Sequence, residues 1–544
     1  MTAPPEKNNF RQTAWLAAIL MTIAAVWLHF YFLFHAGGFW HDEVNLINLA
    51  GRHSLGDMAK DSFPVLMPVI VHGWMALGLG HSDLCLRLLG TVIGLGIIAA
   101  LWIAAGIAHR SPPLVGLTLL GLNSTVINYG DSLRAHGLGS LLIALTSGAM
   151  WIFLKRPSWS RAGILTLAAI LSVQALYQNA ILFAAICFGA WTVCFRRKCF
   201  QTGGKILLVA CVTAATLLPY WKIIAGLPES STSLRIGFVP AVVFTNFDTA
   251  VAFPLRQYIY VWEFLALTVV VFGFATLFDR NKNPRPTANE TSSKDLPLFA
   301  GAALLAAVMA FAGFLRYAAL MTQSWYFLPL LTLAAVCFDL GLPPVRGFLR
   351  AVSFGFLIAT ALVSVPYAQR DLNCRFTNMD LLAQKLESKV APDDFIVVVP
   401  WPFGISFERY FKGPTPWTTV PPVADHSTHR YDLVKLQMQN TNATQPVLDQ
   451  IARTLQAGHR VWVVGSINIP ATNTPPPASL PPPPLAHSGW IETPYDFTWS
   501  AQTACFLGNH ARHFETVYQE TNNNVSFFES MNLFLASGWK TNQP

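Results

Sequence analysis

The most regular feature of the chain is a series of long apolar runs separated by short polar turns. The first run, residues 15–34, is long enough to cross a bilayer as a helix. Further runs of near-spanning length follow as far as residue 366, and together they predict a polytopic helical bundle of about eleven membrane spans. The other predicted spans are residues 84–108, 114–127, 137–154, 164–176, 180–195, 206–221, 258–278, 296–315, 325–338 and 351–366.

Two segments after the first run are too short or too mixed to cross a bilayer. Residues 45–60 are amphipathic, and residues 63–79 are apolar but begin with Phe63-Pro64 and contain Pro68. We expect both segments to lie flat on the membrane surface as interfacial helices in the first outer loop.

The composition changes after residue 366, where helical and strand patterns alternate. This alternation predicts a soluble α/β domain with some parallel strand pairing. We therefore divide the chain into a transmembrane domain, residues 1–366, and a C-terminal domain, residues 367–544. The expected helices are residues 381–390 and 447–455, and the expected strands are residues 394–399 and 460–464.

Charge supports a membrane protein and indicates its orientation. Only 12% of the 544 residues are charged, which is about half the fraction usual for soluble domains. The net charge of +8 reflects basic residues in alternate connections, and such an excess marks the cytoplasmic side. The N-terminus is then expected to be cytoplasmic and the C-terminal domain to lie outside. The basic connections contain Arg110; Lys155, Arg156 and Arg161; Arg196, Arg197, Lys198 and Lys205; Arg280, Lys282, Arg285 and Lys294; and Arg346 and Arg350.

Cysteine and histidine patterns add little specific chemistry. The cysteines show no CxxC metal spacing, and Cys374 and Cys505 could form one disulfide if the C-terminal domain is in an oxidising compartment. His426 and His429 lie beside carboxylates and could bind zinc, but without further His or Cys ligands nearby a loop or helix-cap role is favoured.

The strongest chemical signal is the stretch Phe39-Trp40-His41-Asp42-Glu43, directly after the first span. Ionisable groups at this depth are costly unless they are paired, solvated or functional. We interpret the two carboxylates as the floor of a catalytic cavity at the outer surface. The alternative is that they only end the helix and mark the interface.

Other polar turns are predicted to reach the same outer face as this acidic stretch. If polar turns had no common role, they would be distributed over both faces. Their convergence on one face therefore predicts a site there. The candidate residues in this set are His41, Asp42, Glu43, Asp131, Arg134, His136, Gln178, Asn179, Arg256 and Arg316.

Five motifs follow one another along the chain: Asp42-Glu43, Phe63-Pro64 ahead of Trp74, Leu86-Arg87-Leu88-Leu89, Tyr129 to Arg134, and Tyr326-Phe327-Leu328-Pro329-Leu330. This series resembles the GT-C superfamily of membrane glycosyltransferases, which includes the protein O-mannosyltransferases and the lipid A aminoarabinose transferases. The resemblance covers roughly residues 12–366 and is weaker beyond them. It implies a bacterial inner-membrane enzyme with a polyprenyl-phosphate sugar donor and an acceptor on the outer face.

The resemblance also implies roles for the acidic residues. Asp42 matches the general base, which takes the proton of the acceptor hydroxyl as the hydroxyl attacks with inversion at the anomeric carbon. Glu43 could orient Asp42 or bind a divalent cation such as Mg²⁺ or Mn²⁺. Asp131 could join Asp42 around that metal or orient the acceptor.

Basic residues are expected to bind the phosphate of the donor. Arg134 is the first candidate because a guanidinium can bind phosphate oxygens bidentately, with Arg256 and Arg316 as reserves. Alternatively, Arg134 pairs with Asp131 and holds the turn, and His136 is more simply a packed side chain. Two departures from the family bear on this contact: Ser62-Phe63-Pro64 lacks the usual basic residue, although Lys60 and Asp61 are close, and Trp325 stands where relatives often have arginine.

These observations favour an inverting glycosyltransferase that moves a hexose or pentose from a polyprenyl phosphate to an envelope polysaccharide, glycolipid or protein. No DxD nucleotide-sugar motif is evident in the sequence, which agrees with a lipid donor, and no nucleic-acid partner is expected. The alternative is a transporter or flippase of lipid-linked sugars. It ranks lower because transporters place polar groups near the bilayer midplane. A structural envelope protein with incidental carboxylates is the third interpretation.

Overall fold

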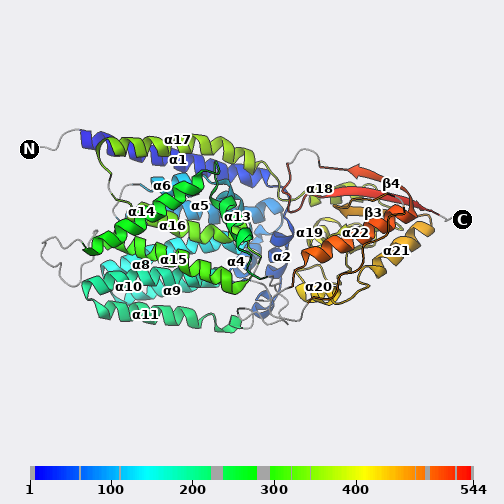
Figure 1. Cartoon of the computed structure of the whole chain (residues 1–544), viewed down its shortest axis with the longest axis horizontal. Helices are drawn as coiled ribbons and strands as arrows, with labels where there is room; N and C mark the ends of the chain where they lie inside the picture. The colour runs from blue at the N-terminus through cyan, green and yellow to red at the C-terminus, as the bar shows by residue number, and fades with distance from the viewer. Residues whose placement is uncertain are drawn as a thin grey trace, which may run out of the picture. The chain divides into compact units, whose positions relative to one another are not determined.

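The structure is a computed structural model, shown in Figure 1. The chain forms two compact units, each built from several segments. Unit one comprises Met1–Phe34, Phe63–Trp221 and Phe238–Leu372, and unit two comprises His35–Ser62, Lys222–Gly237 and Asn373–Pro544. The structure describes residues 6–59, 63–108, 112–221, 224, 237–278, 295–319, 321–343, 345–471, 473–483, 490–520 and 524–540.

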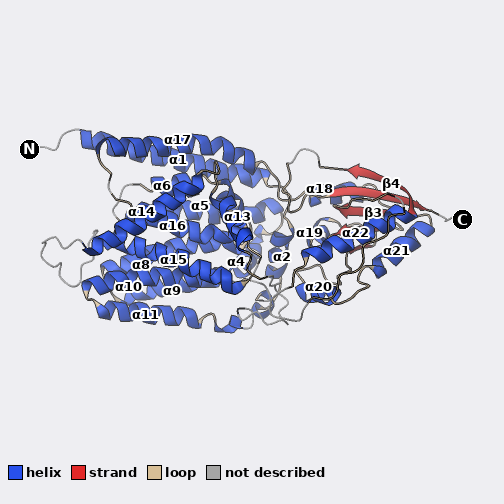
Figure 2. Cartoon of the chain, in the orientation of Figure 1, coloured by secondary structure: helices blue, strands red, loops and turns tan. Residues whose placement is uncertain are grey.

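Unit one is a bundle of apolar helices (Figure 2). Among the described residues, eight helices are long and apolar enough to cross a membrane. Their mean hydropathies of 1.4 to 2.3 reflect runs of Leu, Ile, Val, Phe and Ala with few charges. They are α1 (Glu6–His35), α5 (Asp83–Ile107), α8 (Ala135–Lys155), α10 (Gln178–Arg197), α14 (Tyr258–Phe278), α15 (Leu296–Ala318), the 3₁₀ turn Ser324–Phe327 with α16 (Leu328–Gly341), and α17 (Gly347–Leu372).

The three remaining predicted spans are shorter or broken, so the count of eleven stays a prediction. Two of them are α9 (Trp159–Ala175) and α11 (Phe200–Ala215). The third divides into α6 (Leu114–Gly116), a π-helical turn (Leu117–Gly121) and α7 (Ser124–Gly130). The pieces are stabilised by polar side chains: Asp339 accepts the Val115 and Gly116 N–H groups at 3.1 and 2.9 Å, and Asn123 caps α7.

The segments expected to lie flat on the membrane have different places in the fold. The second one forms α4 (Leu66–Trp74) and a π-helical turn (Met75–Leu79) in unit one. The first one belongs to unit two, where α2 (His41–Ala50) packs against α19 (Phe403–Tyr410) and a short helix α3 (Leu55–Met58) follows. One more helix of unit one, α13 (Pro240–Val251), precedes α14.

Unit two is built on a five-stranded sheet with the order β2-β1-β3-β5-β4. β1 pairs in parallel with β2 and β3, whereas β5 is antiparallel to β3 and β4. The strands are β1 (Phe395–Val399), β2 (Trp417–Thr419), β3 (Arg460–Gly465), β4 (Ala511–Tyr518) and β5 (Asn532–Trp539); the helices are α18 (Met379–Glu387), α19, α20 (Tyr431–Met438), α21 (Gln445–Gln456) and α22 (Thr493–His510).

The two faces of this sheet carry separate cores, because side chains alternate along each strand. Val397 and Val463 pack with buried residues of α20, α21 and α22. Ile396, Val398 and Trp462 pack on the other face with α18 and α19. Both faces are thus covered by helices, which suits the continuous apolar sequence of β1.

The predicted fold class, a polytopic helical membrane bundle with a C-terminal α/β domain, is confirmed. The expected helices near residues 381–390 and 447–455 and the expected strands near 394–399 and 460–464 are all present, with parallel β1–β3 pairing. Sequence reasoning missed β2, β4, β5, α19, α20 and α22. The possible disulfide is absent, since Cys374 and Cys505 are both free thiols. The predicted domain boundary after residue 366 stays a prediction.

Candidate active site

The acidic stretch forms the first turn of α2, and two aromatic residues fix its start. Trp40 has an extended backbone, and its carbonyl accepts the N–H groups of Glu43 and Val44. The Trp40 ring is buried and stacks on Phe376 with ring centroids 5.8 Å apart, and the Phe39 N–H donates to the Tyr410 hydroxyl at 2.6 Å. Asp42 and Glu43 therefore lie at a helix N-terminus, where negative charge is stabilised.

Two histidines from distant parts of the sequence flank Asp42. The Oδ1 atom of Asp42 lies 3.8 Å from Nε2 of His41 and 3.5 Å from Nε2 of His429. The three donor atoms all lie within 4.8 Å of one another, and the three side chains are 13–18% exposed. Among the described residues, this is the one group of three or more such side chains close enough to hold a metal ion.

A buried carboxylate sets the orientation of His41. Glu529 is fully buried, and its Oε2 accepts from both the backbone N–H and the Nδ1 of His41, at 2.8 and 2.7 Å. Its Oε1 accepts from the hydroxyls of Ser406 and Thr377 at 2.6 and 2.9 Å. Because Nδ1 donates to Glu529, the lone pair of the neutral imidazole is on Nε2, which faces Asp42 and His429.

α2 also holds the segment that carries His429. The side-chain oxygen of Asn45 accepts the His429 N–H at 2.9 Å, and the amide of Asn48 donates to the Ser427 carbonyl at 2.8 Å. The imidazole of His429 stacks on Tyr431, with centroids 5.7 Å apart and planes at 15°. Both imidazoles are thus fixed before any ligand binds.

A pair of acidic side chains lies near the cluster. The indole N–H of Trp401 donates to Glu492, and the edge of Trp401 contacts His429 with ring centroids 6.3 Å apart. Burial raises the pKa of Glu492, and its hydrogen bonds with Trp401 and Asp496 oppose that rise. Burial and then the neighbouring Glu492 raise the pKa of Asp496 well above its usual range. The pair therefore retains a proton at pH values where exposed carboxyls have lost theirs.

The donor set fits a divalent transition metal. Two nitrogen ligands and one carboxylate suit Zn²⁺ or Mn²⁺ better than Mg²⁺, which prefers oxygen ligands. Ligand atoms on a tetrahedral zinc lie about 3.4 Å apart, close to the 3.5 and 3.8 Å separations measured from Asp42. The carboxylate behind His41 is the usual second partner of a metal-bound imidazole. The loop or helix-cap role favoured for His429 does not account for its contact with Asp42. His426 does not join this group: its ring packs against Trp417, and burial lowers its pKa to about 4.

In unit one, Asp131 pairs with a histidine of the first span. The Nδ1 of His29 lies 2.8 Å from both carboxylate oxygens of Asp131, and both residues are buried. The α5 backbone leaves room for this carboxylate: a Cβ added at Gly94 would lie 1.7 Å from its Oδ1, and one at Gly90 would lie 1.8 Å from the Asp131 carbonyl oxygen. Asp131 thus pairs with His29, and not with Arg134 as the alternative role of Arg134 required; Arg87 also acts on Asp131 through its charge.

Arg134 lies instead in an aromatic cluster of unit one. Its guanidinium carbon is 5.3 Å from the Trp325 ring centroid and 5.8 Å from that of Phe63. His136 stacks on Tyr326 with ring planes at 14°, and the Gln178 amide donates to the Tyr326 carbonyl at 2.9 Å. We refer to Phe63, Arg134, His136, Gln178, Trp325 and Tyr326 as the aromatic–basic cluster. Three of the predicted site residues, Arg134, His136 and Gln178, thus come together here.

The remaining predicted site residues have other surroundings. The amide of Asn179 donates to the Gly139 carbonyl at 2.9 Å and to Ser172, which links α8, α9 and α10. Arg256 is 84% exposed beside Asp248, and Arg316 lies over the Phe238 ring. Glu43 is fully buried, so a role in orienting Asp42 suits it better than contact with solvent. Lys60 and Asp61 lie outside the described residues.

Sequence reasoning missed two residues of these sites and the partners of a third. His29 lies in the middle of an apolar run, and an ionisable residue at such a depth was itself a signal. Glu529 has no local motif, because its partners are distant in sequence. His429 was noticed, but its partners His41 and Asp42 could not be found from local spacing.

Comparisons with known proteins give a distant structural likeness. No protein-family model matches the chain, and no curated protein matches it. Solved structures similar to it include the oligosaccharyltransferase of Archaeoglobus fulgidus tethered with an acceptor peptide containing the NVT sequon, at 10% identity and a TM-score of 0.49 over 97% of this chain and 74% of that chain.

Two further solved structures have lower TM-scores. The oligosaccharyltransferase AglB from Archaeoglobus fulgidus, in complex with an inhibitory peptide and a dolichol-phosphate, matches at 11% identity and a TM-score of 0.41, over 85% of this chain and 70% of that chain. ArnT from Cupriavidus metallidurans in the apo state matches at 12% identity and a TM-score of 0.40, over 83% and 93%.

Proposed function

We propose that the chain is an inverting glycosyltransferase that uses a polyprenyl-phosphate sugar as donor and a hydroxyl of an envelope molecule as acceptor. The observation that carries this proposal is Asp42, a partly exposed carboxylate held between two oriented imidazoles. A fixed carboxylate that solvent can reach is the group that proton removal from a hydroxyl requires.

The reaction follows from the residues in a single displacement. The acceptor oxygen attacks the anomeric carbon, and its proton passes to Asp42. The bond from that carbon to the phosphate oxygen breaks, and its electron pair leaves with the lipid phosphate. A guanidinium would stabilise the charge on the leaving phosphate, and Arg134, held between Trp325 and Phe63 in unit one, stays the candidate for this role. One displacement inverts the anomeric configuration.

We also propose that His41, Asp42 and His429 bind a divalent transition metal ion. Such an ion would supply positive charge beside the negative charge that develops on a sugar phosphate. This metal site is tested by measuring Mn²⁺ binding to the purified protein with electron paramagnetic resonance. We expect His429→Ala to weaken binding at least tenfold and His513→Ala, which changes an exposed histidine of β4, to leave it unchanged. Equal Mn²⁺ affinity in wild type and His429→Ala would overturn the metal site.

Transfer itself is tested with the purified protein and a panel of synthetic polyprenyl-phosphate sugars, with the consumed sugar identified by mass spectrometry. We expect Asp42→Asn to slow transfer by about 100-fold or more, because general-base catalysis contributes that much. Asp393→Asn, which changes an exposed carboxylate of the same unit, serves as the control and should transfer at the wild-type rate. Transfer by Asp42→Asn at the wild-type rate would remove Asp42 from the role of base.

A further inference from the structure

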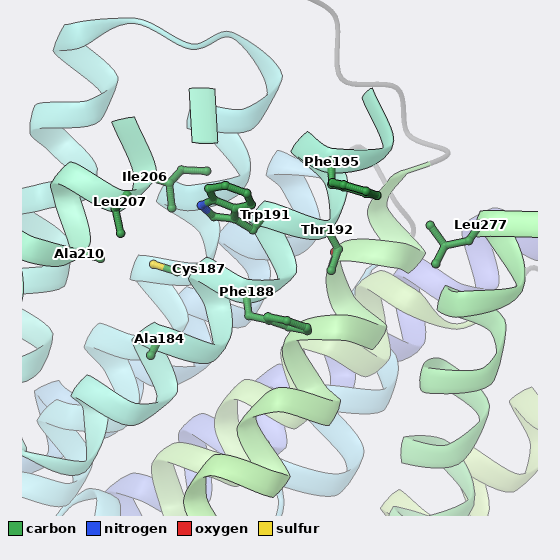
Figure 3. A pocket seen from close by; sticks show the side chains of 10 residues that line it. All are labelled: Ala184, Cys187, Phe188, Trp191, Thr192, Phe195, Ile206, Leu207, Ala210 and Leu277. Carbon is green, nitrogen blue, oxygen red and sulfur yellow. The ribbon is translucent and has the colours of Figure 1, made fainter. Parts of the chain in front are cut away.

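An apolar groove lies on the surface of unit one between α10, α11 and α14 (Figure 3). It has a volume of about 420 Å³. The small side chains of Ala184, Cys187 and Ala210 leave this space open, and the rings of Phe188, Trp191 and Phe195 line it. Phe188 and Phe195 are 51% and 69% exposed, so the groove opens to the surroundings of the bundle.

The lining indicates a hydrocarbon ligand. Its one hydroxyl belongs to Thr192, and this hydroxyl donates to the Gly189 carbonyl within α10 at 2.7 Å. A polar ligand would find little to bind here. α10 and α14 are both candidate membrane spans, so the groove faces the acyl chains of the lipid. An alkyl chain is the ligand that matches these walls.

One end of the groove carries positive charge. Phe195 is followed directly by Arg196, Arg197 and Lys198, and Lys205 directly precedes Ile206, which lines the groove from α11. The single carboxylate of Asp295 forms ion pairs with both Arg196 and Arg197. It offsets one of their two positive charges, so this end of the groove keeps an excess of positive charge. Lys198 is exposed, and it lies at the start of the turn that leads into α11.

We propose that this groove binds one anionic phospholipid, with an acyl chain along Phe188, Trp191 and Phe195 and the phosphate at Arg196 and Lys198. The charge at the end of the groove selects the headgroup, and the apolar walls select the chain. This end belongs to the set of basic connections that the sequence assigns to the cytoplasmic side. The site is separate from the proposed sugar-transfer residues and does not depend on them.

The test is lipid binding to the delipidated full-length protein, measured by native mass spectrometry. Phosphatidylglycerol and phosphatidylcholine with the same acyl chains are titrated separately. We expect wild type to bind one phosphatidylglycerol at least fivefold more tightly than any phosphatidylcholine. Ala184→Phe, which fills the groove, should abolish this site. Ala310→Phe, the same change at an exposed position of α15 outside the groove, should retain it.

Two further results decide between the possible occupants. Lys198→Gln should reduce the preference for phosphatidylglycerol while the melting temperature stays at the wild-type value. Equal binding of both lipids by wild type would overturn the anionic site, and so would retention of phosphatidylglycerol by Ala184→Phe. Displacement of phosphatidylglycerol by an equimolar polyprenyl phosphate would assign the groove to the donor lipid instead and overturn the proposal.

Discussion

The His41–Asp42–His429 cluster of unit two differs from the His29–Asp131 pair of unit one in exposure and in the groups that hold it. In unit two the functional atoms are partly exposed, and Glu529, Asn45 and neighbouring hydroxyls orient them through hydrogen bonds. In unit one, Asp131 is fully buried and pairs with His29. The comparison indicates that unit two holds its ionisable side chains at a partly exposed place, as the proposed proton transfer and ion binding require, whereas unit one holds the His29–Asp131 pair in an apolar surrounding at a fixed position.

The largest effect on stability is expected from breaking the buried pair of unit one. His29→Leu leaves the Asp131 carboxylate without its histidine, which should destabilise the bundle by about 3–5 kcal/mol. Thermal unfolding of the full-length protein in detergent measures this. The double variant His29→Leu/Asp131→Leu should recover part of the loss. If it is as unstable as the sum of the two single variants, the two residues are not coupled.

The second-largest loss of stability is expected when the space that α5 leaves for Asp131 is filled. Gly94→Ala places a Cβ 1.7 Å from the Asp131 Oδ1, so the carboxylate must move, and we expect a loss of about 1–3 kcal/mol. Gly106→Ala on the same helix has nothing within 4 Å of the added Cβ and should be neutral or stabilise by up to about 1 kcal/mol. Equal melting temperatures for the two variants would contradict this account of α5.

A smaller effect is expected from the acidic pair of unit two. Because burial raises the pKa of both Glu492 and Asp496, the folded state binds more protons than the unfolded state above the usual carboxyl range. Stability from this pair is therefore present at low pH and falls as the pH rises through the raised values. Asp496→Asn should reduce the loss of stability between pH 5 and pH 8 by about 1 kcal/mol or more. An unchanged pH dependence would show that the pair does not share a proton.

The smallest effect is expected at Arg256. This side chain is 84% exposed, and its pairing with Asp248 at 3.1 Å is worth at most about 0.5 kcal/mol. Arg256→Gln should leave both melting temperature and sugar transfer close to wild type. A tenfold fall in transfer, with unchanged melting, would instead place Arg256 among the phosphate-binding residues and weaken the case for Arg134.

Hydrophobic periodicity predicted most of the helices, because the length of an apolar run is a local property. It also predicted β1 and β3, whose continuous Val and Ile residues are buried on both faces. It missed β4, whose exposed and partly exposed residues give a weak pattern. It also predicted one intact helix over residues 114–127, which breaks before Ser124; there the Asn123 amide donates to the Ala250 carbonyl, a contact that depends on tertiary structure.

The candidate residues themselves could be predicted from the sequence, but their contacts could not. His41, Asp42 and Asp131 were identified from their places at the ends of predicted spans. Their partners were not, because Glu529, His429 and His29 are brought to them by the fold. The sequence therefore supplied candidate residues at the turns, whose roles stay predictions, and an incomplete list of their contacts.

The central claim, that Asp42 is the base of sugar transfer, is tested most directly by the transfer rate of Asp42→Asn beside that of the control Asp393→Asn, each with its melting temperature. If Asp42 takes the acceptor proton, Asp42→Asn should be slowed at least about 100-fold while both variants melt at the wild-type temperature. Transfer at the wild-type rate by correctly folded Asp42→Asn would contradict the claim.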